Sequence, residues 1–200
     1  GSRGLTALET LFFGSVTIGV LARTTTPVLI VRAPLSNKKS LQKIGIAVDE
    51  SERSERVIAY LIANRKLFPE NCEFQAVYVS RSVDDFMFGA LGAASLAASG
   101  RTAGLAQAAL LSEAGGKELE QQAFENVMAP LRPFFAELGG VREVMLRGNA
   151  GDEIAKYANK EKLDLLIMGS HGRSNVESAF AGSVVMRVAA QGSVPLFIVR

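Results

Sequence analysis

The sequence predicts an α/β protein built on an open, parallel sheet of five strands with helices on both faces. Short, almost wholly apolar runs alternate with segments of helical periodicity over residues 43–200. Strands that helices cover on both faces read as apolar runs of this kind, because neither face meets water. Apolar residues make up 48% of the 200 residues, which is enough to fill one core.

The predicted strands are the apolar runs at residues 43–48, 74–79, 143–146, 163–168 and 195–199. The first predicted helix begins at Ser51 or Ser54, and the others cover residues 118–138, 151–159 and 183–190. Pro130 and Pro133 should bend or break the long second helix. Open parallel sheets bind ligands beyond the carboxyl ends of the strands, where the strand order reverses. The residues that follow the first and fourth strands are therefore the expected site.

Charge and composition exclude some partners. Lysine and arginine number 22 against 20 aspartates and glutamates, so no strong field attracts a nucleic-acid backbone or an anionic membrane. No run reaches the roughly 18 consecutive apolar residues of a membrane helix. The single cysteine, Cys72, cannot form an intrachain disulfide, which favours a reducing compartment. We expect a cytoplasmic protein that binds neither nucleic acid nor membranes.

The two ends of the chain are copies of one unit. Residues 1–32 align without a gap on residues 169–200, at an offset of 168 residues. The identical positions include Gly1 and Gly169, Gly4 and Gly172, Gly14 and Gly182, Ser15 and Ser183, and Pro27 and Pro195. We interpret residues 1–34 as the C-terminal fragment of a first domain, residues 35–42 as a linker, and residues 43–200 as a complete second domain.

A glycine motif follows the fourth predicted strand. Gly169, His171 and Gly172 lie in the sequence GSHG, and after nine further residues Gly182 and Ser183 begin a helix. Glycines allow a backbone to approach a ligand closely, and a helix N-terminus offers unpaired N–H groups and a positive dipole end. The two glycine clusters can converge on one phosphate chain. The alternative is that the first cluster only forms a turn and the second only begins a helix.

This motif resembles that of the ATP-binding universal stress proteins, G-2x-G-9x-G-S or G-2x-G-9x-G-T. The resemblance covers residues 43–200 in element order, with residues 1–32 as a partial second copy, and implies a Rossmann-like fold of the adenine nucleotide alpha hydrolase type. It also implies a set of nucleotide-binding residues: Asp49, Val79, Met168, Gly169, His171, Gly172, Gly182, Ser183 and Val184. Glu50 departs from the family pattern, where glycine is frequent, as does Ala150, where proline is frequent. Asp49 could equally be a helix cap or a structural carboxylate.

The resemblance implies a stress-response regulator that binds ATP or AMP, with or without magnesium. One alternative is a slow ATP hydrolase or phosphotransferase, although the sequence has no Walker-type lysine and no acidic pair for magnesium. No catalytic residue is assigned, because the only histidine, His171, has no visible orienting partner. A second alternative is an assembly module without nucleotide.

Self-association has a predicted location. The last strand should lie at an edge of the sheet, and an apolar edge needs covering. Family members often pair two such strands antiparallel across a twofold axis. We therefore expect the run from Val28 to Val31 to pair with the run from Leu196 to Val199, within one chain or between the two chains of a dimer. The alanine- and glycine-rich stretch at residues 86–116 fits a connection, or a lid or contact surface.

Overall fold

One sheet of six strands organises the computed structural model, which describes residues 19–21, 23–31, 40–80, 113–170 and 182–200. The strand order is β1-β6-β5-β2-β3-β4. The strands are β1 (Val28–Ile30), β2 (Lys43–Ala47), β3 (Glu73–Ser80), β4 (Val141–Arg147), β5 (Leu165–Gly169) and β6 (Leu196–Val199). Strands β2 to β6 pair in parallel, as predicted, and β1 runs antiparallel to β6.

The order of the strands reverses at β2. From β2 the chain moves outward to β3 and β4, and then crosses back to β5 and β6 on the other side of β2. The carboxyl ends of β2 and β5 therefore flank the switch point, where sheets of this kind bind ligands.

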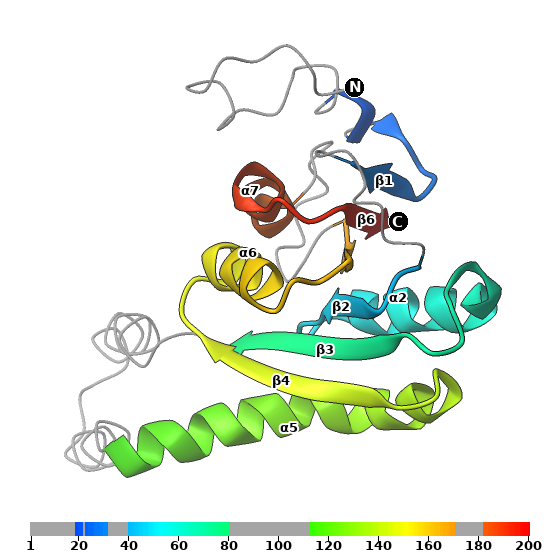
Figure 1. Cartoon of the computed structure of the whole chain (residues 1–200). Helices are drawn as coiled ribbons and strands as arrows, with labels where there is room; N and C mark the ends of the chain where they lie inside the picture. The colour runs from blue at the N-terminus through cyan, green and yellow to red at the C-terminus, as the bar shows by residue number, and fades with distance from the viewer. Residues whose placement is uncertain (1–18, 22, 32–39, 81–112, 171–181) are drawn as a thin grey trace.

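Helices cover both faces of the sheet, as predicted (Figure 1). The helices are α2 (Glu52–Ala63), the short 3-10 helix η2 (Arg65–Leu67), α5 (Glu113–Glu137), α6 (Ala150–Lys160) and α7 (Ser183–Gln191). Apolar side chains of α2 and α5 form one core with the sheet, which includes Ile44, Ile58, Leu61, Met128 and Leu131. Those of α6 and α7 form a second core on the opposite face, which includes Ile154, Leu166, Val185, Val188 and Ile198. Full burial of each such side chain contributes about 1.5–3 kcal/mol.

Helix α5 is continuous over 25 residues and contains both Pro130 and Pro133, so the predicted break is wrong. A proline has no N–H to bond the carbonyl four residues earlier, which here belongs to Asn126 and to Ala129. All four residues are exposed. Water can therefore bond the two carbonyls, while the buried side of α5 holds the helix to the sheet.

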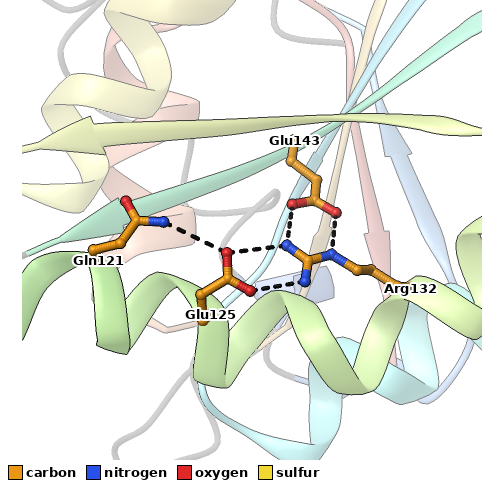
Figure 2. A network of polar contacts seen from close by, with 4 residues as sticks. All are labelled: Gln121, Glu125, Arg132 and Glu143. Atoms are coloured by element: carbon orange, nitrogen blue, oxygen red, sulfur yellow. Dashed lines mark hydrogen bonds and ion pairs between the residues drawn. The ribbon is translucent and has the colours of Figure 1, made fainter.

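Arg132 joins α5 to the edge strand β4 (Figure 2). Its Nε and Nη2 donate to the two carboxylate oxygens of Glu143 at 2.8 Å, and its Nη1 donates to Glu125 at 2.7 Å. Gln121 donates a weaker hydrogen bond to Glu125 at 3.5 Å. The hydrogen bonds from Arg132 lower the pKa of the Glu125 carboxyl. Charged groups on an edge strand also oppose its pairing with another chain.

Strand β1 covers the edge that β6 would otherwise expose. Leu29 lies opposite Phe197 in this pairing, which confirms the predicted contact in its intrachain form. Leu21, which precedes β1, is only 1% exposed and packs with the α6 and α7 core. Association between chains and the domain boundaries 1–34, 35–42 and 43–200 stay predictions. The stretch at residues 86–116 falls outside the described residues up to position 112.

Candidate functional site

A cavity of about 610 Å³ opens at the carboxyl edge of the sheet, at the switch point. Its walls come from the ends of β2, β3 and β5 and from the first turns of α2, α6 and α7. This volume lies within the roughly 300–1,000 Å³ of small-molecule sites. The cavity therefore has the size and position expected of a ligand site in this kind of fold.

Asp49 lies directly after β2 and organises the turn into α2. Its Oδ1 accepts hydrogen bonds from the amide of Ser51 and the hydroxyl of Ser54, both at 3.1 Å. The Asp49 amide donates to Ser54 Oγ at 2.8 Å. Within the described part of the chain, every hydrogen bond of the carboxylate is made by Oδ1. The Asp49 carboxylate thus has the structural role that the sequence allowed, and its second oxygen, Oδ2, remains available to a ligand.

Val79 offers backbone groups at the end of β3. Neighbouring residues of a strand direct their N–H and C=O groups to opposite sides. The Val77 carbonyl accepts from Val48 at 3.0 Å, on the side of β2, and the Ser80 carbonyl accepts from Gly148 at 3.0 Å, on the side of β4. The amide and carbonyl of Val79 therefore point to the side of β2, where β2 has already ended and the cavity begins.

The start of α7 has uncapped amides beside the cavity. Gly182 is the N-cap residue, and no side chain caps this helix. The first intrahelical bond of α7 runs from the Met186 amide to the Gly182 carbonyl at 3.0 Å. The amides of Ser183 and Val184, both of which line the cavity, consequently have no partner within the helix. Such amides and the helix dipole favour an anion.

Two segments that flank the glycine loop meet at this point. The Gly182 amide donates to the Ser170 carbonyl at 2.8 Å, and the Ser170 amide donates to the Val199 carbonyl at 2.9 Å. Gly169, at the end of β5, therefore lies close to the start of α7. Gly169, Gly182 and Ser183 all line the cavity, so the described residues of the two glycine clusters lie at one site. Their convergence on a phosphate chain stays a prediction.

The first turn of α6, which packs beside α7, also lines the cavity. The Asn149 side chain caps this helix by accepting from the Asp152 amide at 3.3 Å. Arg187 of α7 reaches across and donates from Nε to Asp152 Oδ1 at 2.7 Å. This hydrogen bond, together with one from Gln191, lowers the pKa of the Asp152 carboxyl. Gly151 and Arg187 both line the cavity, so its edge follows the crossing of α6 and α7.

Among the described residues that line the cavity, the side-chain charges are balanced. Asp49 and Glu50 bring two carboxylates, and Arg53 and Arg187 bring two guanidinium groups. Tyr78 donates to Glu50 Oε1 at 3.3 Å, which draws this carboxylate toward β3. Since these charges cancel, the features of the described lining that favour an anion are the helix amides and the placement of each arginine. No cluster of three or more His, Cys, Asp or Glu suited to a metal occurs among the described residues.

The structure brings together seven of the nine residues that the sequence predicted for the site: Asp49, Val79, Met168, Gly169, Gly182, Ser183 and Val184. The other two, His171 and Gly172, lie outside the described residues. Sequence reasoning missed the wall formed by α6 and the cavity-lining Arg187. A signal for Arg187 existed, since it follows Ser183 by four residues and so shares its helix face.

The fold and the cavity define a class of protein, an open parallel α/β protein with a small-molecule cavity where the strand order reverses. The chain belongs to the universal stress protein family, whose model matches residues 1–32 and 40–200. Among the helices of the described segments, none has the length and apolar character needed to cross a bilayer.

Relatives with curated names agree with this assignment. Universal stress protein MJ0531 of Methanocaldococcus jannaschii is 35% identical over 86 residues, which cover 42% of this chain and 48% of that protein. Universal stress protein MJ0577 of the same organism is 31% identical over 77 residues, which cover 38% of this chain and 48% of that protein. The chain thus spans about half the length of these curated relatives.

Solved structures share the fold. The structure of MJ0577 matches with a TM-score of 0.58 at 22% identity, over 80% of this chain and 96% of that one. A universal stress protein from Archaeoglobus fulgidus matches with a TM-score of 0.57 at 19% identity, over 99% of this chain and 58% of that one. At these identities the likeness establishes the fold alone.

Proposed function

We propose that this protein binds an adenine nucleotide, ATP or AMP, in the cavity at the switch point and acts as a nucleotide-dependent regulator in the stress response. The observation that carries the proposal is the gathering of Asp49, Val79, Gly169 and Ser183 from four separate segments around one cavity of about 610 Å³. Occupancy would favour one conformation or one assembly state, and no reaction is required.

Each wall of the cavity suits one part of the nucleotide. The outward-facing amide and carbonyl of Val79 suit the edge of the adenine ring, which has both a donor and acceptors. Asp49 Oδ2 suits the ribose hydroxyls, which donate hydrogen bonds. The uncapped amides of Ser183 and Val184 suit the phosphates. A magnesium ion that accompanies the nucleotide would take water and phosphate oxygens as its main ligands.

Titration calorimetry of the full chain with ATP, AMP and GTP tests the proposal. We expect ATP or AMP to bind more tightly than GTP. Gly182→Val should lower the affinity about tenfold or more, because the side chain blocks the approach to the helix amides. The backbone at Gly182 (φ −54°, ψ 152°) is one that any residue adopts, so this variant tests access and not strain.

Ser193→Ala is a matched control for Ser183→Ala. Ser193 follows the carboxyl end of α7 and donates from its hydroxyl to Asn159 at 2.9 Å, away from the cavity. We expect Ser183→Ala to weaken nucleotide binding and Ser193→Ala to leave it unchanged. Absence of binding by the unmodified chain, or equal effects of the two serine variants, would count against the site.

A further inference from the structure

We propose that Arg187 determines which phosphate chain the cavity prefers, and that it favours a nucleoside triphosphate over a monophosphate. This inference rests on the proposed function and specifies the ligand of the same site. It concerns a residue that the glycine motif does not include.

Arg187 stands where a long phosphate chain would extend. It follows Ser183 by four residues in α7, so the two side chains share one face of the helix, about 6 Å apart along its axis. Both residues line the cavity. If the first phosphate of a nucleotide binds the amides near Ser183, a monophosphate does not reach Arg187. The further phosphates of a triphosphate can approach the Arg187 guanidinium group.

The neighbouring helix fixes the orientation of the Arg187 side chain. Its Nε donates to Asp152 Oδ1 at 2.7 Å, and Gln191 donates to the same oxygen at 2.7 Å. Its aliphatic part lies on Gly151, where an added Cβ would come within 2.8 Å of the Arg187 Cβ and 2.9 Å of its Cδ. The glycine thus leaves room for the side chain to cross the first turn of α6. An arginine held in place in advance loses little entropy when it binds.

The guanidinium group keeps donors for a ligand. Among the described residues, its hydrogen bond to Asp152 uses only Nε, and the side chain remains 52% exposed. The two Nη atoms of an arginine form a planar set of donors that matches the oxygens of a phosphate. Among the described residues, the other arginine that lines the cavity is Arg53, which belongs to α2 on the opposite face of the sheet. Of these two arginines, Arg187 is the one on the same helix as the α7 amides.

The test compares affinities for ATP, ADP and AMP by titration calorimetry, for the unmodified chain and for Arg187→Gln. We expect Arg187→Gln to lower the affinity for ATP about tenfold or more and to change the affinity for AMP less than about twofold. Arg187→Lys, which keeps the charge without the planar donors, should retain part of the preference for ATP.

Two controls separate this role from a structural one. Arg132→Gln also removes an arginine from an exposed ion pair, but this arginine lies on α5, which does not line the cavity. The ratio of the affinities for ATP and AMP should therefore stay unchanged in this variant. Arg187→Gln with equal losses for ATP and AMP would overturn the inference and leave the proposed function intact. An unmodified chain that binds no nucleotide would overturn both.

Discussion

Leu29 lies opposite Phe197 in the antiparallel pairing of β1 with β6, and the two residues occupy the same position in the two copies of the sequence repeat. In the repeat Val28 corresponds to Leu196 and Ile30 to Ile198. In the sheet these partners are exchanged, because Val28 faces Ile198 and Ile30 faces Leu196. A local twofold axis therefore passes between Leu29 and Phe197. The register of the two strands therefore has the same twofold symmetry as the repeat in the sequence.

The surroundings of the two residues break this symmetry. The Phe197 ring packs on Tyr60, with 6.0 Å between the ring centroids, whereas the Leu29 side chain is 53% exposed. Phe197→Ala should therefore lower the free energy of unfolding by about 2 kcal/mol or more. Leu29→Ala should lower it by less than about 0.5 kcal/mol. Urea titrations measure both changes, and equal costs would indicate that another chain covers Leu29 in solution.

The sequence was sufficient for most of the sheet. The run at residues 43–48 is apolar at nearly every position, as expected of a strand that is covered on both faces, and its short length favours a strand over a helix. It forms β2. The error at Pro130 and Pro133 has a physical reason. The free-energy cost of a missing N–H depends on whether water can reach the carbonyl that loses its partner. Asn126 and Ala129 are exposed only as a result of how the chain folds, so the sequence pattern does not show this.

The site was predictable only in part. Asp49 and Gly169 follow strands, so the rule for parallel sheets places them at one edge. Arg187 shares a helix face with Ser183, but this spacing alone does not distinguish it from a solvent-facing arginine. Its position at the cavity depends on the crossing of α6 over α7, which pairs residues 35 positions apart. Such a contact cannot be inferred from the spacing of either helix alone.

Pro130→Ala should stabilise the protein. The variant restores an amide that can bond the Asn126 carbonyl, at an exposed position in the middle of α5. Alanine is favoured over proline inside a helix by about 3 kcal/mol, and we expect a gain of about 1–3 kcal/mol in urea unfolding. Pro69→Ala, in the loop before β3, is the control and should cause no gain, because a loop proline restricts the unfolded chain. A loss of stability in Pro130→Ala would contradict this account of α5.

Gly151→Ala should destabilise the crossing of α6 and α7, although alanine is the better helix former by about 1 kcal/mol. The new Cβ would lie 2.8 Å from the Arg187 Cβ, which cannot move without displacing α7. We expect a net loss of about 1–3 kcal/mol in urea unfolding. We also expect nucleotide affinity to fall, since both residues line the cavity. A variant as stable as the parent would indicate that the two helices separate readily.

The ion pair between Asp152 and Arg187 should contribute to stability only above acidic pH. The hydrogen bonds from Arg187 and Gln191 hold the pKa of Asp152 below its usual value near 4 in the folded protein. The contribution is therefore complete above pH 4 and is lost as the pH falls through the lowered pKa. Urea midpoints measured from pH 7 to pH 2.5 should fall less steeply for Asp152→Asn than for the parent. Glu125→Gln removes a second carboxyl with a lowered pKa. The urea midpoint of the double variant should therefore depend on pH even less than that of Asp152→Asn.

Cys72 should report unfolding through its reactivity. Burial raises the pKa of the thiol above its usual value, and the nearby positive charge of Arg65 opposes part of this rise. At pH 8 the folded protein should therefore react with a disulfide reagent more slowly than the urea-unfolded chain, because less thiolate is present and access is reduced. The reaction rate should also be measured as a function of pH. We expect the midpoint for the folded protein to lie above that for the unfolded chain, because a raised thiol pKa shifts the midpoint, whereas reduced access only lowers the rate. Equal midpoints would show that access alone slows the reaction.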